Sequence, residues 1–336
     1  MKKQKIFYLD FIRVLSMFMI VTYHFYAHFA ENNITGIVVP FASGKWGIIG
    51  VALFFMISGA SLMYNYGEQI NIKKYFVKRF LGIFPMFWLA YATLFIYLFY
   101  QSKGVPTAAP LYRLIFSVCG MDGYLSCYIE TVYLIGEWFL GCIILIYILF
   151  PFLRVAVKKY PRITFIIVTV LNFALLLFYR QGRMSISKNI IVCAYSFLLG
   201  MYAVKIKKIA WWHALIALVL SVVFYKLPTN DTNILVLYTR MSAYLLYIVL
   251  AYIGQKISNL TLQTIFVTVA KYSYAVFLVH HYLIMKILST FQGRAFGIAG
   301  TGLLYLVCWV QIAIIAKVLY VANQEVLSLF KNKKRD

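Results

Sequence analysis

Charged side chains are scarce in this sequence of 336 residues. Only 12% of the residues are Asp, Glu, Lys or Arg, whereas a soluble domain carries roughly a quarter. Hydrophobic residues make up 63% of the chain, and the mean hydropathy is +0.84. No polar stretch is long enough to form a soluble domain, since the longest polar connection lies around residues 102–130. This composition excludes an ordinary soluble protein and indicates a multi-pass membrane protein.

Motifs that bind metals, phosphates or dinucleotides are also missing. The five cysteines do not have the spacing of zinc ligands, and the chain contains no Walker loop and no dinucleotide fingerprint. Internal repeats and low-complexity tracts are absent as well. We therefore expect no metal ion and no tightly bound cofactor.

Acidic residues are the rarest charged group, with nine Asp and Glu against 32 Lys and Arg and a net charge of +23. The basic residues are divided among short loops, which argues against nucleic acid as a partner. If the N-terminus is cytoplasmic, the larger share of the basic residues falls in cytoplasmic connections, as the positive-inside rule requires. The charge also suits contact with anionic lipid headgroups or an anionic ligand. We predict that both termini are cytoplasmic and that the protein lies in the plasma membrane.

Apolar runs of about 20 residues, the length that crosses a bilayer, recur along the chain. We expect an all-α integral membrane protein, built as a bundle of about ten transmembrane helices. The expected spans lie near residues 7–28, 46–66, 80–100, 131–153, 162–179, 189–204, 210–226, 233–253, 264–286 and 298–321. The apolar but interrupted segment 110–127 is expected to lie at the membrane interface or to re-enter the membrane. We assign residues 1–325 to the transmembrane domain and residues 326–336 to a basic cytoplasmic tail.

The first expected span carries three ionisable residues, Asp10, Arg13 and His24. A charged group at the centre of a transmembrane helix costs about 2.5–3.5 kcal/mol, so such residues usually mark a site or a pathway. Asp10 and Arg13 are three residues apart and are expected to pair on one helix face. Arg13 and His24 are eleven residues apart, which returns to nearly the same face about 16 Å along the helix. The simpler alternative is a structural ion pair and a hydrogen-bonded histidine.

An arginine, ten further residues and a histidine follow a short basic start, and this motif resembles membrane acyltransferase family 3. Four more stretches are similar to that family in the expected order: FFMISG at 54–59, VKRFLGIFPMFW at 77–88, EWFLGCIILIYILFP at 137–151 and YSYAVFLVHH at 272–281. The sequence departs from the family at Gly82, where a second arginine is common. The resemblance implies a membrane enzyme that O-acylates carbohydrates of the cell envelope.

The chemistry of this reaction assigns roles to some of the residues. Acyl transfer to a sugar hydroxyl requires a base, and histidine titrates near neutral pH. The donor, acyl-CoA and most simply acetyl-CoA, is a cytoplasmic polyanion whose phosphates suit arginine. We therefore expect His24 to be the base and Arg13 to orient the donor or the histidine. Arg79, with Lys78, is expected to hold the CoA phosphates.

Further residues are candidates for substrate contact or structural support, namely Asp10, Ser58, Glu137 and His280. Ser58 is followed by Gly59, and the pair also suits close helix packing. Of the adjacent His280 and His281, we prefer His280, because it takes the motif position. His28 is expected at the level of the outer headgroups.

Glu137 is the one acidic residue well inside a middle span. An unpaired carboxylate is costly at this depth, so Glu137 is expected to meet Arg240, Lys271 or water. Pairing with Glu137 or snorkelling would equally explain the two basic residues.

Two other functions fit the same charged residues. A transporter or flippase for a polysaccharide or lipid-linked intermediate also needs buried Arg, His and Glu along a pathway. A noncatalytic membrane component of envelope assembly needs none of the chemistry. We favour the enzyme because motifs in five spans resemble those of the acyltransferase family. Its acceptor is expected to be a surface carbohydrate or lipid-linked glycan. Many relatives carry an added extracytoplasmic esterase-like domain, so a separate extracytoplasmic transferase is a further expected partner.

Overall fold

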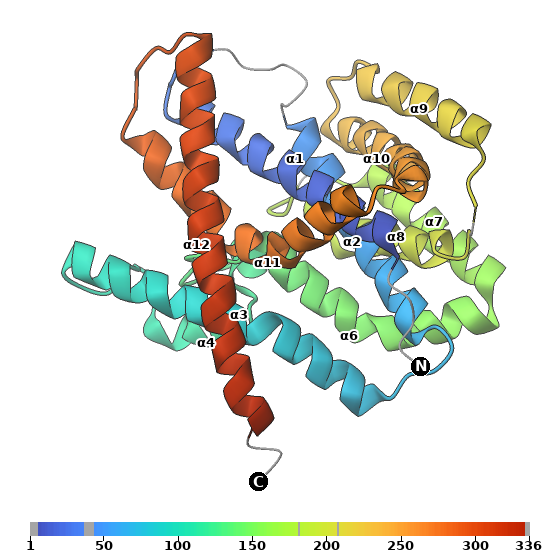
Figure 1. The fold of residues 1–336 in the computed structure, drawn as a ribbon, viewed down its shortest axis with the longest axis horizontal. Helices are drawn as coiled ribbons and strands as arrows, with labels where there is room; N and C mark the ends of the chain where they lie inside the picture. Colours follow the sequence, from blue (N-terminus) through green and yellow to red (C-terminus); the bar gives the residue numbers. More distant parts are fainter. Residues whose placement is uncertain (1–5, 37–43, 181, 207, 333–336) are drawn as a thin grey trace. The chain divides into compact units, whose positions relative to one another are not determined.

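The computed structural model describes residues 6–36, 44–180, 182–206 and 208–332 of the chain, and Figure 1 shows that this part is built of helices. The long helices are α1 (Phe7–Glu31), α2 (Lys45–Tyr66), α3 (Ile72–Ser102), α6 (Glu137–Lys159), α7 (Pro161–Phe178), α8 (Ile190–Ala203), α9 (Trp211–Lys226), α10 (Thr232–Lys256), α11 (Leu260–Ser289) and α12 (Ile298–Asn332). Within the described residues the only extended pairing is an isolated bridge between Thr35 and Ala295. The predicted all-α class is confirmed.

Each expected span corresponds to one of these helices. Eight of the described helices have both the length and the apolar composition to cross a membrane, whereas α8 and α9 are shorter apolar helices of 14 and 16 residues. The cytoplasmic location of the two termini stays a prediction.

The start of the fourth span was predicted wrongly. The fourth span was expected from residue 131, but α6 begins at Glu137. Gly136 has a φ of +100°, which is outside the helical region, so the chain turns there before the helix starts. The preceding segment 110–127 holds only short helices: the 3₁₀ helix η2 (Leu111–Arg113), α4 (Leu114–Val118) and α5 (Asp122–Leu125).

The chain divides into two compact units. In the described residues, the first contains the chain up to residue 23, residues 44–70 and residues 148–273, and the second contains residues 24–36, 71–147 and 274–332. α1, α6 and α11 therefore contribute to both units along their own length.

In the first unit, α2 lies very close to α8. A Cβ atom added at Gly59 would overlap the backbone oxygen of Phe197, and one added at Gly200 would overlap that of Met56. Glycine at these two positions lets the helix backbones approach each other, as small residues do in membrane bundles. The packing interpretation is thus confirmed for Gly59, while a site role of Ser58 stays a prediction.

Arg240 is buried in the first unit, where both terminal nitrogens of its guanidinium donate hydrogen bonds. Its guanidinium donates to the carbonyl oxygens of Val192 at 3.2 Å and Ser187 at 2.8 Å, and to the Ser196 hydroxyl at 2.7 Å. Ser196 in turn shares a hydrogen bond with Tyr244 at 2.9 Å. This network accounts for the buried charge of Arg240, so the expected explanations, a Glu137 pair or snorkelling, are not needed.

Aromatic contacts fix the helices of the second unit. The ring of Phe25 on α1 packs edge-on against Tyr305 on α12, with centroids 5.0 Å apart. Phe277 on α11 packs against Phe139 on α6 at 5.4 Å. Tyr274 on α11 donates to the backbone oxygen of Ile83 in α3 at 3.1 Å. These contacts join α1 to α12, and they join α11 to both α6 and α3.

The glycine contact between α2 and α8 predicts a stability difference. Gly200→Ala should lower the thermal unfolding temperature of the purified protein in detergent, since overpacking costs about 1–3 kcal/mol. The matched control is Gly82→Ala in α3, where an added Cβ has no described neighbour within 4 Å. That control should be neutral or slightly stabilising, because alanine favours helix by up to about 1 kcal/mol over glycine. Equal unfolding temperatures for the two variants would contradict the contact.

Candidate functional site

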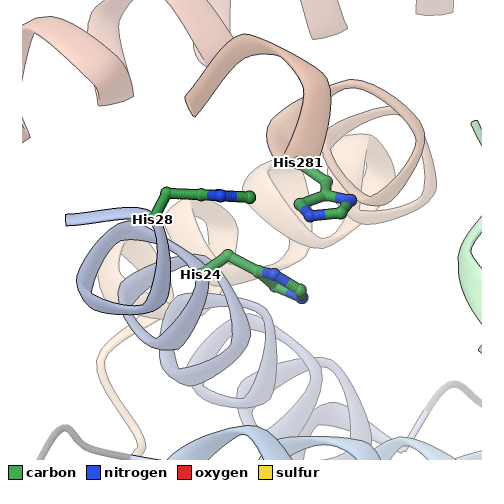
Figure 2. Close-up of side chains that lie close together, drawn as sticks. All are labelled: His24, His28 and His281. Atoms are coloured by element: carbon green, nitrogen blue, oxygen red, sulfur yellow. The ribbon is translucent and has the colours of Figure 1, made fainter. Parts of the chain in front are cut away.

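Four histidines of the second unit gather around two helices. His24 and His28 are four residues apart, on one face of α1, and His280 and His281 are adjacent on α11. Figure 2 shows the rings of His24 and His28 directed toward the ring of His281. We call His24, His28, His280 and His281 the histidine cluster.

The rings of the histidine cluster are in direct contact. The centroid of His281 lies 4.6 Å from that of His24 and 4.7 Å from that of His28. His28 and His281 are stacked, with planes 25° apart. The His280 ring stands nearly perpendicular to that of His24, with centroids 5.0 Å apart. His24 therefore has the ring of another histidine on more than one side.

Glu137 binds the cluster from α6. One carboxylate oxygen forms a very close ion pair with Nδ1 of His281 and accepts a hydrogen bond from the Tyr133 hydroxyl at 2.9 Å. The Glu137 side chain is only 14% exposed. Because the carboxylate takes Nδ1 of His281, the other ring nitrogen, Nε2, is left for a further partner.

In two more members of the cluster, Nδ1 has a hydrogen-bond partner in the protein. His28 places Nδ1 at 2.6 Å from a carboxylate oxygen of Glu31. His280 places Nδ1 at 2.9 and 3.1 Å from the backbone oxygens of Phe277 and Val276, so this nitrogen carries the proton. The Nε2 atoms of His28 and His280 are buried and make no hydrogen bond to the described residues. Both atoms are thus available to a ligand or a substrate.

The backbone around Glu137 is unusually constrained. Glu137 itself has a φ of +30°, in the region that residues other than glycine rarely adopt. A Cβ at Gly123 would overlap the backbone of Glu137 and Trp138, so the α5 segment presses directly on the start of α6. Strained backbone of this kind persists where the surroundings over-determine it, and functional sites are such places.

The predicted site residues divide between the two units. His24, Glu137 and His280 are brought together in the second unit, as described above. Asp10 and Arg13 lie in the first unit, and their predicted pairing is confirmed by an ion pair of 2.5 Å. Their functional roles stay predictions.

The two residues expected to bind CoA phosphates lie on α3 in the second unit. Arg79 is half-buried and places its guanidinium over the ring of Tyr147, 5.5 Å from the centroid. Its Nε makes no hydrogen bond to the described residues. Lys78 is exposed. Phosphate binding by either residue stays a prediction.

One expectation about a neighbouring residue was wrong. Glu137 was expected to meet Arg240, Lys271 or water, but the structure pairs it with His281. His28 is buried, with 5% of the residue exposed, and its place at the level of the outer headgroups stays a prediction. The preference for His280 over His281 as a site residue also stays a prediction, while His281 makes the ion pair and contacts both histidines of α1.

Signals for two of these residues were present in the sequence. The spacing of His24 and His28, four residues on a helix, places them on one face and is a spacing used by pairs of zinc ligands. Glu31 follows His28 at the next turn, which suits a hydrogen-bonded pair. Tyr133 was placed inside the expected span 131–153, but the structure leaves it in the non-helical segment before α6, so nothing in the sequence placed its hydroxyl on Glu137.

The chain was compared with protein families, curated proteins and solved structures. A family model described as an acyltransferase domain matches residues 6–318, which is nearly the whole chain and includes the histidine cluster. No curated protein and no solved structure matches the chain.

Asp122, beside Gly123 in the connection between α3 and α6, predicts a pH effect. Burial raises the pKa of this carboxyl to about 6. The folded state thus favours the protonated form, and the stability that it contributes is lost as the pH rises through about 6. Asp122→Asn should unfold about 2 °C or more above the wild type at pH 8, with a smaller difference at pH 5. A difference that does not change with pH would contradict the shift.

Proposed function

The chain belongs to the acyltransferase domain family, and from this premise we propose that it transfers an acyl group from cytoplasmic acyl-CoA to a hydroxyl of an extracytoplasmic cell-envelope carbohydrate. The family and the eight apolar helices make the chain a multi-pass membrane acyltransferase. The proposal adds acyl-CoA as donor, acetyl as the simplest acyl group and the plasma membrane as location. It also adds a surface carbohydrate or lipid-linked glycan as acceptor.

The observation that carries the proposal is the contact of the His24 ring with His281, which is itself held by Glu137. In the proposed reaction the acceptor hydroxyl oxygen attacks the thioester carbonyl carbon, and His24 removes the hydroxyl proton. The C–S bond then breaks, and the proton passes to the CoA sulfur. A histidine base of this kind contributes about 10²–10⁴-fold in rate.

Glu137 supports this step by its charge. When His24 takes the proton it becomes a cation, and a nearby carboxylate stabilises that cation in a site with little water. Because Glu137 also binds Nδ1 of His281, it fixes the orientation of the ring that packs on His24. His281 is thus a positioning residue in the proposed mechanism, and Tyr133 positions Glu137 through its hydroxyl.

Arg79 and Lys78 are proposed to bind the phosphates of the donor. The Arg79 guanidinium lies over the ring of Tyr147, and its N–H groups are proposed to bind phosphate oxygens. Arg13 is proposed to orient the donor, with Asp10 holding the guanidinium in place through the 2.5 Å ion pair. Gly82 removes one cation from the family's basic motif, so Arg79 carries a larger share of donor binding here.

Removing the base should abolish ester formation. In cells expressing His24→Ala, ester-linked acyl groups on released envelope polysaccharide should fall about 100-fold or more, as measured by mass spectrometry. Polymer export should continue. The matched control is His213→Ala, an exposed histidine at the start of α9, which should leave the ester content unchanged. Both variants are compared at equal membrane levels.

Two results would count against the proposal. An unchanged ester content in His24→Ala would mean that this histidine is not the base. Failed export with a normal ester content per polymer would indicate a transport pathway instead of acyl transfer.

Donor binding gives a separate prediction. In membrane vesicles, Arg79→Ala should raise the KM for acyl-CoA about tenfold, equivalent to about 1.4 kcal/mol, with a smaller effect on kcat. Lys78→Ala should have a weaker effect, because this exposed side chain lacks a fixed position. Arg162→Ala, an exposed arginine at the start of α7, is the control and should leave the KM unchanged. Equal KM values for Arg79→Ala and the control would remove Arg79 from the donor site.

A further inference from the structure

Three members of the histidine cluster have the arrangement of a metal site. One ring nitrogen from each of His24, His28 and His281 lies within 4.8 Å of the other two, and Figure 2 shows the three rings grouped between α1 and α11. Two of the ligands come from one helix at a separation of four residues, and the third comes from another helix. Many zinc sites with histidine ligands are built in this way.

The carboxylate partners of two of the rings strengthen this interpretation. A histidine that binds a metal almost always gives its second ring nitrogen to a carboxylate, a carbonyl or water. Here Glu31 holds Nδ1 of His28 and Glu137 holds Nδ1 of His281. Both carboxylates therefore leave the Nε2 atom as the ligand atom, and they fix the two rings that would bear it.

The Nε2 atom of His28 gives independent evidence for a bound ligand. It is buried and has no hydrogen-bond partner among the described residues. A buried polar atom without a partner destabilises the folded protein, and a bound ion would offset that cost. The His281 side chain is 31% exposed, so the cluster also has an open side through which an ion and a fourth ligand can enter.

The geometry requires only small side-chain movements. Zinc–nitrogen bonds of 2.0–2.1 Å in a tetrahedral site place ligand nitrogens about 3.4 Å apart. The three nitrogens already lie within 4.8 Å of one another, so side-chain rotations that bring them closer would complete the shell. Imidazole ligands suit Zn²⁺, Cu²⁺ and Ni²⁺, whereas Mg²⁺ and Ca²⁺ prefer oxygen.

We propose that His24, His28 and His281 bind one divalent transition-metal ion of the Zn²⁺ class, and that this ion inhibits the protein. The inhibition rests on the proposed function: an ion on His24 occupies the lone pair that the base needs, so metal binding and proton removal exclude each other. Metal binding itself does not depend on that function. The cysteine pattern gave no reason to expect a metal, because all three ligands are histidines.

Metal binding is tested directly on the full chain, purified in detergent without a polyhistidine tag and stripped with a chelator. Titration with Zn²⁺ should show one ion per chain, and Co²⁺ should give the visible absorption of a tetrahedral site. His28→Ala should weaken Zn²⁺ binding at least 100-fold. His213→Ala, a histidine outside the cluster, should bind like the wild type.

A second variant tests the site without the risk that His28→Ala fails to fold. Glu31→Ala removes no ligand atom and changes a side chain that is 65% exposed, so the fold should be retained. It should weaken Zn²⁺ binding about tenfold, because losing an outer-shell partner typically costs 10–100-fold in affinity. No bound ion in the wild type, or equal binding by the wild type and both variants, would overturn the site.

Inhibition is tested separately in the acyl-transfer assay. Zn²⁺ should reduce transfer by the wild type, a chelator should restore it, and the transfer that remains in His28→Ala should be insensitive to Zn²⁺. Bound Zn²⁺ without inhibition would overturn the inhibitory role and leave the metal site supported. Normal ester formation by His24→Ala would overturn the proposed function, while the direct titration would still decide the metal site.

Discussion

A carboxylate at the start of a membrane-spanning helix needs a fixed partner, because an unpaired charge there is costly. Glu137 has that partner in His281, and the rest of the site depends on their ion pair. The pair joins α6 to α11, fixes the His281 ring against both histidines of α1, and leaves one nitrogen of that ring available. The glycine at 123 and the turn at Gly136 let the backbone of Glu137 reach this position.

The fold could be predicted from the sequence because lipid imposes a simple rule on composition. Each membrane-crossing helix must satisfy its own backbone hydrogen bonds and present apolar side chains, so hydropathy alone located the ten helices. The start of α6 was missed for a physical reason. Residues 131–136 are apolar enough to continue a span, but they are not helical, and the positive φ values of Gly136 and Glu137, +100° and +30°, mark the turn at which α6 begins. Hydropathy does not report backbone conformation.

The site could be predicted only in part. His24 and Glu137 were found because ionisable groups are rare in apolar helices, and the Asp10–Arg13 pair followed from helical spacing. The partner predicted for Glu137 was wrong, because the residue that meets Glu137 depends on which face of α11 packs against α6. That choice is made by packing contacts such as Phe277 on Phe139, which join helices far apart in the sequence. Burial of His28 depends on the same packing.

The chain has five histidines, and four of them form the histidine cluster. The fifth, His213, lies on α9 beside the ring of Trp212. Imidazole is therefore a natural reporter group in this protein. Any measurement selective for histidine, such as nitrogen-15 resonance of the rings or acylation by a histidine reagent, observes the site almost without background, and one substitution at position 213 would leave the site as the sole source of the signal.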